Sequence, residues 1–150
     1  MKNLPIPLAK QVNRVPSMRI KLNAKQEREF DKLLDELFMI DLHQHPMVCA
    51  DDMTRFVEYL RIGDLKWGYE AAIEGGWSTI ATANCFRGMV NSPELSYISF
   101  EDLIEEVGLM LSDVSQHHEI ATRVTNVNEI LSAFQSRKLG FLPTVEHLAI

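Results

Sequence analysis

Short apolar segments alternate with amphipathic helical segments along this chain, and that alternation constrains the fold more than any other feature of the sequence. Segments 40–43, 77–83 and 141–145 are apolar and short, and 120–124 is a further candidate strand. The connections between them are too long for hairpins, so the strands are expected to run parallel in βαβ units. The sequence therefore predicts an α/β fold.

Capping residues and glycines mark the predicted helices between these strands. Three pairs have the spacing of helix N-terminal caps: Asn23 with Gln26, Ser99 with Asp102, and Asn126 with Glu129. Further helices are predicted from about residue 52 and over 65–74, the second ending at Gly75-Gly76. Residues 86–97 are predicted to form a loop that could act as a lid, and residues 1–22 an extended N-terminal arm.

The candidate site residues lie at the carboxyl ends of the first and last of these strands. His43 and His45 stand two residues apart after an apolar run, so in an extended strand both imidazoles face the same side. Imidazole is the commonest metal ligand, and Asp41 could orient a ligand ring from outside the coordination shell. Glu146 follows the last strand, and parallel sheets collect their working residues at the carboxyl ends of strands. The alternative is that all of these side chains are merely solvated.

The segment Asp41-Leu42-His43-Gln44-His45 resembles the Asp-Gly-His-x-Asp-type motif on the first strand of the membrane dipeptidase (renal dipeptidase) family of the amidohydrolase superfamily. Val145-Glu146-His147 resembles that family's Glu-Gly-Gly-like motif after the third strand, and the order and spacing are similar across residues 40–150. Three features depart from the pattern, and one of them is the absence of aromatic residues from Ala81-Thr82-Ala83, near the end of the second strand. His45 stands where the family usually has Asp, and His147 where it has Gly.

This resemblance implies a (β/α)₈ TIM-like barrel with two zinc ions, in which His43 and position 45 bind the first ion and Glu146 bridges both. A barrel of this kind needs about 250 residues. The 150-residue chain is therefore expected to be the N-terminal portion of an incomplete barrel, with an arm over 1–22 and the barrel part over 23–150. By itself it is expected to be inactive and poorly soluble.

The implied function is a metal-dependent, dipeptidase-like hydrolase that cleaves an amide or peptide-type bond of a small peptide-like substrate with a metal-activated water. One or two divalent ions are expected, with zinc as the favoured metal. His45 and the absence of aromatic residues from Ala81-Thr82-Ala83 motivate an alternative, in which the barrel has lost catalysis and serves as a binding or scaffold protein.

Composition narrows the classes of partner. The net charge is -6 and no basic cluster is present, so nucleic acid is not an expected partner. No apolar run approaches about 18 residues, so no membrane span is expected. The two cysteines, Cys49 and Cys85, suggest no disulfide framework, which favours reduced thiols and a cytoplasmic location. A homo-oligomer is left open. Cys85 is interpreted as a buried thiol that could line the site, and His117 and His118 as helix-end residues.

Overall fold

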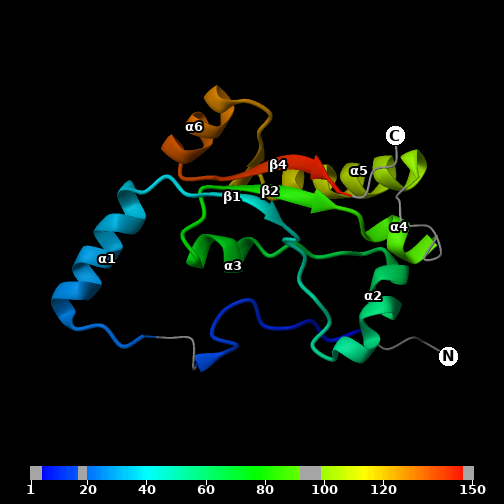
Figure 1. Ribbon diagram of the computed structural model, residues 1–150, viewed down its shortest axis with the longest axis horizontal. Coiled ribbons are helices and arrows are strands. Elements are labelled where there is room, and N and C mark those ends of the chain that lie inside the picture. The colour runs from blue at the N-terminus through cyan, green and yellow to red at the C-terminus, as the bar shows by residue number, and fades with distance from the viewer. Residues whose placement is uncertain (1–4, 17–19, 92–98, 147–150) are drawn as a thin grey trace.

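The protein is built on a four-stranded, wholly parallel sheet flanked by helices (Figure 1). A computed structural model describes residues 5–16, 20–91 and 99–146. The strands are β1 (Ile40–Gln44), β2 (Thr79–Asn84), β3 (Ala121–Arg123) and β4 (Leu139–Val145), and their order in the sheet is β1-β2-β4-β3. The predicted α/β class and the parallel direction of the strands are confirmed.

Three of the helices begin at the capping residues that the sequence predicts. In chain order the helices are α1 (Ala24–Glu36), the 3-10 turn η2 (Met53–Arg55), α2 (Phe56–Ile62), α3 (Tyr69–Glu74), α4 (Phe86–Asn91), α5 (Phe100–Gln116) and α6 (Val127–Gln135). The side chains of Asn23, Ser99 and Asn126 each accept a backbone N–H in the first turn of α1, α5 and α6 respectively. No helix within the described ranges is long and apolar enough to cross a membrane.

The core lies on both faces of the sheet, around β2 and β4. All six residues of β2 are buried, because the strand lies between β1 and β4. Phe141 of β4 packs in the larger core with Met110 and Val114 of α5. The next residue, Leu142, packs against a smaller cluster that includes Ile130 of α6. Because successive strand residues face opposite sides, α5 and α6 cover opposite faces of the sheet.

Strand β3 lies at the sheet edge beyond β4, so the sheet does not follow chain order. It pairs with β4 only over residues 139–141. The sequence predicts a last strand without a neighbour on its open side, and this is wrong at Phe141, which pairs with Arg123. A regular (β/α)₈ barrel would place consecutive strands side by side. The four strands therefore form an open sheet with β3 as an outer strand.

Two predicted elements differ from the structure. Residues 65–68 are not helical, because they run against the segment after β1, where Val48 N donates to Lys66 O at 2.7 Å and Gly68 N to Pro46 O at 2.6 Å. The predicted loop over 86–97 begins instead as helix α4, while residues 92–98 lie outside the described part of the chain. Both differences come from tertiary contacts that local sequence does not reveal.

The N-terminal arm is docked on the domain along residues 5–16. Leu8 forms an antiparallel bridge with Ala50, and Ala9 N donates to Cys49 O at 3.0 Å. Helix α1 extends away from the sheet and contains no buried residue (Figure 1). An ion pair between Arg137 and Asp35 at 2.5 Å ties its C-terminal end to the turn after α6.

Candidate metal centre

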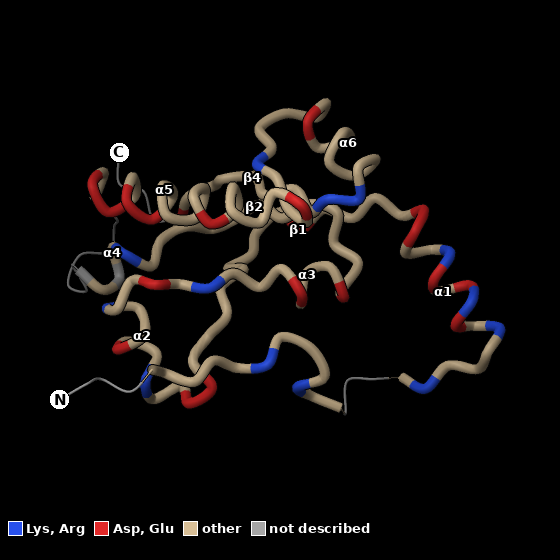
Figure 2. Tube along the Cα trace, turned by 180° about the vertical axis from the view of Figure 1, so that it is seen from behind, with Lys and Arg blue, Asp and Glu red and all other residues tan. Residues whose placement is uncertain are grey.

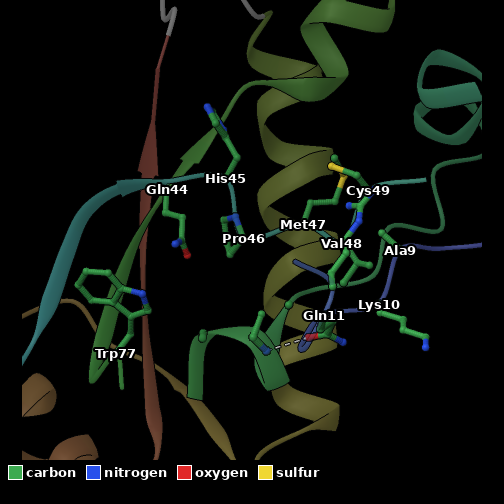
Figure 3. Close-up of a pocket in the computed structure, with 14 residues that line it drawn as sticks. Ala9, Lys10, Gln11, Gln44, His45, Pro46, Met47, Val48, Cys49 and Trp77 are labelled. Atoms are coloured by element: carbon green, nitrogen blue, oxygen red, sulfur yellow. Dashed lines mark hydrogen bonds between the residues drawn. The ribbon is translucent and has the colours of Figure 1, made fainter. Parts of the chain in front are cut away.

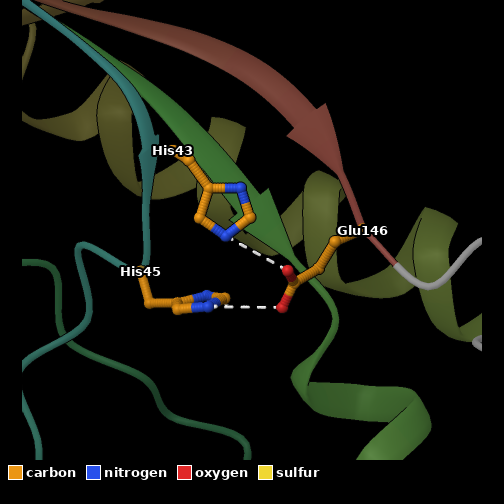
Figure 4. A group of neighbouring side chains, drawn as sticks. All are labelled: His43, His45 and Glu146. Atoms are coloured by element: carbon orange, nitrogen blue, oxygen red, sulfur yellow. Dashed lines mark ion pairs between the residues drawn. The ribbon is translucent and has the colours of Figure 1, made fainter.

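His43, His45 and Glu146 converge at the carboxyl ends of β1 and β4 (Figure 4). His43 Nε2 lies 3.1 Å from Glu146 Oε2, and His45 Nε2 lies 3.3 Å from Glu146 Oε1. One ligand atom from each residue lies within 4.8 Å of the other two. Within the described ranges, this is the one group of three or more His, Cys, Asp or Glu side chains with such geometry. The structure thus brings the three predicted ligands together.

An irregularity in β1 contributes to this geometry. The pairing of β1 with β2 shifts register between Asp41 and Gln44, as a β-bulge does. Such bulges bend a strand and re-aim its side chains. Asp41 Oδ1 accepts the backbone N–H of His43 at 3.0 Å and so closes a local turn at this point. Asp41 was predicted to orient a ligand ring; the contact found is with the backbone of His43.

The three side chains differ in their exposure to solvent. The side chain of His43 is 62% exposed, that of His45 38%, and that of Glu146 24%. The His45 ring packs edge-on against Phe86 of α4, with ring centroids 5.1 Å apart. Glu146 is therefore the sheltered member of the group, while His43 faces solvent and leaves the centre accessible to a small molecule.

Two distances within the group are close to the separation of two ligands on one ion, and each joins an imidazole to a different oxygen of Glu146. Nitrogen and oxygen ligands bind zinc at about 2.0–2.2 Å, so two ligands at a tetrahedral angle stand roughly 3.3–3.5 Å apart. The two N···O distances of 3.1 and 3.3 Å lie close to that separation. They are also hydrogen-bond distances, so the same geometry describes a His–Glu–His cluster without metal.

Cys85 lies behind the Glu146 carboxylate. Its thiol donates to Glu146 Oε1 over an Sγ–O distance of 3.1 Å, and the residue is 3% exposed. Burial, followed by the hydrogen bond to Glu146, raises the pKa of Cys85 to about 12, so the group is a neutral thiol. The interpretation of Cys85 as a buried thiol agrees with this, and the residue also contacts the candidate ligand.

Glu106 of α5 holds the turn that carries Cys85. It is 1% exposed, and its carboxylate accepts hydrogen bonds from the backbone N–H groups of Cys85 at 3.0 Å and Arg87 at 2.8 Å. Burial raises the pKa of Glu106, and the backbone N–H donors oppose that rise. This carboxylate caps the first turn of α4 from another helix, which explains why residues 86–91 are helical.

Glu106 is the residue near the site that sequence reasoning missed. Glu106 lies in the first turns of α5, where the helix dipole alone accounts for an acidic residue. A signal was available, because Glu106, Met110 and Val114 are spaced by four and lie on the buried stripe of α5.

The remaining histidines lie elsewhere or outside the described residues. His117 caps the end of α5, where its Nδ1 lies 2.9 Å from Asp113 O, and His118 is exposed nearby. His147 lies outside the described part of the chain.

A cavity of about 290 Å³ lies on the other side of the segment that follows β1 (Figure 3). Residues of the arm, the segment 44–49, the start of α3 and Trp77 line it. The imidazole of His45 points away from Trp77 and Gln11, which lie across the cavity (Figure 3). His45 also belongs to the lining of the cavity, so the cavity and the group of candidate ligands share this residue.

No family model, no curated protein and no solved structure matches this chain. The functional argument accordingly rests on the geometry around His43, His45 and Glu146.

Proposed function

We propose that His43, His45 and Glu146 bind a divalent metal ion, with zinc as the expected metal, and that the protein is a metal-dependent hydrolase of amide or peptide-type bonds. The observation that carries the proposal is the convergence of two imidazoles on the two oxygens of one carboxylate, at 3.1 and 3.3 Å. A bound zinc ion would lower the pKa of a water ligand and polarise a substrate carbonyl.

The residues supply the features that such chemistry needs. Catalytic zinc sites have three protein ligands and an open position for water or substrate, and three side chains meet here. The exposed His43 leaves one side of the centre open, so a small peptide-like substrate could approach it. A second ion bridged by Glu146, as the family resemblance implies, would need ligands beyond this group.

We also propose that the sheet is the N-terminal portion of a TIM-like barrel. Two observations support it: all strand pairs are parallel, and the three candidate ligands follow strand ends on one edge of the sheet. In this proposal β3 is an outer strand beside the start of β4 and not a barrel strand, since it covers only residues 139–141.

Metal analysis of the purified chain tests the site. We expect one equivalent of zinc after incubation and dialysis, and its loss in His43→Ala and Glu146→Gln. His118→Ala is the matched control, because that side chain is 81% exposed and lies away from the group. Unchanged zinc content in both site variants would mean that the three side chains form a hydrogen-bonded cluster only.

Hydrolysis of a panel of dipeptides and N-acyl amino acids, with and without added zinc, tests the activity. Because the sheet by itself is expected to be inactive, the assay uses a protein that contains the complete proposed barrel. Zinc-dependent turnover that is abolished by Glu146→Gln is the expected result. Stoichiometric zinc binding without turnover of any member of the panel would favour the alternative, a binding or scaffold protein that retains the metal site.

A further inference from the structure

We propose that Cys85 is a positioning residue of this centre: its thiol donates a hydrogen bond that orients the Glu146 carboxylate toward the two imidazoles. The inference rests on the proposed metal site and adds to it a residue outside the ligand group. It is carried by the Sγ–Oε1 distance of 3.1 Å and by the burial of Cys85.

The position of the thiol suits this role. Glu146 is the first residue after β4, and its backbone N–H donates a long hydrogen bond to Asn84 O at 3.4 Å. Its side chain has several rotatable bonds, and a hydrogen bond from a fixed donor restricts the orientation of the carboxylate plane. Oxygen Oε1 lies near both Cys85 Sγ and His45 Nε2, while Oε2 faces His43.

Cys85 is itself held by the body of the protein. It follows β2, the fully buried central strand, and its backbone N–H donates to the buried carboxylate of Glu106 at 3.0 Å. Arg87, two residues further along, donates its N–H to the same carboxylate and pairs through its side chain with Glu105. Figure 2 shows acidic segments of α5 near α4, and the two helices are in contact. The long helix α5 therefore fixes the turn from which the thiol reaches Glu146.

Hydrogen bonds of this kind affect metal affinity. Carboxylates that bind metals are usually held by a further donor, and removal of that donor typically costs 10–100-fold in affinity. Cys85→Ala removes the donor, whereas Cys85→Ser keeps an O–H donor at nearly the same place. Cys49→Ala is the matched control, because Cys49 is the other free cysteine and is not among the three candidate ligands.

The experiment measures the zinc affinity of the full chain by competition with a chromophoric chelator. We expect Cys85→Ala to weaken zinc binding about 10–100-fold, with Cys85→Ser and Cys49→Ala each staying within about threefold of the wild type. Circular dichroism melting without zinc monitors folding. Cys85→Val, which fills the space without a donor, replaces the alanine variant if that variant does not fold.

Each result has a distinct meaning. An unchanged affinity in Cys85→Ala overturns the positioning role and leaves the metal site intact. Equal weakening in the serine and alanine variants assigns Cys85 to packing and also overturns the role. Failure of the proposed function is recognised separately, because zinc would then bind wild type and Glu146→Gln equally or bind neither.

Discussion

Replacement of Glu106 by leucine is expected to destabilise the fold, because it removes an acceptor shared by two backbone N–H groups. Cys85 N lies 3.0 Å and Arg87 N 2.8 Å from the carboxylate, and the first of these bonds is buried. A buried donor left without a partner costs about 1–3 kcal/mol. Leucine also removes a carboxylate whose burial is unfavourable, as its raised pKa indicates, and this offsets part of the loss. The net destabilisation expected for Glu106→Leu is about 1–3 kcal/mol.

The assay is urea unfolding followed by circular dichroism at neutral pH, with Glu105→Leu as the matched control. Glu105 is the preceding residue of α5, its side chain is 49% exposed, and its ion pair with Arg87 lies at the surface. Surface pairs contribute about 0.2–1 kcal/mol, so the control variant should lose less than about 1 kcal/mol.

Two results would refute the reasoning. If Glu106→Leu is as stable as the wild type, then the N–H groups of Cys85 and Arg87 are satisfied without this carboxylate. If Glu105→Leu loses as much stability as Glu106→Leu, then the effect belongs to the charge of the helix and not to the cap on α4.

Three further predictions concern pH, packing and metal binding. Burial raises the folded-state pKa of Glu106. The part of its contribution to stability that depends on protonation is therefore complete below the unfolded-state pKa and is lost as the pH rises through the folded-state pKa. The unfolding free energy of the wild type relative to Glu106→Gln should therefore fall with rising pH, and a flat difference in urea titrations would contradict this. Gly140→Ala should destabilise the fold by about 1–3 kcal/mol, because the added Cβ would lie 2.6 Å from Thr79 Oγ1. Gly108→Ala meets no neighbouring atom within 4 Å and should stabilise α5 by roughly 1 kcal/mol. Thermal melts that rank the two variants in the opposite order would exclude this packing. Zinc at about 100 times its Kd should raise the unfolding free energy by about 2.7 kcal/mol in the wild type but not in Glu146→Gln, and an equal rise in both would show binding elsewhere.

Local signals in the sequence are sufficient to predict several elements of the fold. The Asn23, Ser99 and Asn126 caps begin helices because a side-chain oxygen three residues upstream satisfies an otherwise unpaired N–H. The apolar strands appear within a few residues of their predicted bounds. His43 lies near the carboxyl end of β1 and Glu146 directly after β4, and the two meet because parallel strands have their carboxyl ends at the same edge of the sheet.

The order of the strands and the surroundings of the site depend on tertiary packing and could not be predicted from local sequence. Nothing local to residues 121–123 places β3 beyond β4, since that arrangement depends on pairing with a strand distant in the chain. Nothing local makes residues 86–91 helical either, because the cap comes from Glu106, about twenty residues away. The contact between Cys85 and Glu146 joins residues 61 positions apart. The spacing of residues along the sequence indicates which face of a helix or strand each one occupies. Contacts between residues far apart in the chain depend on how the helices and strands pack.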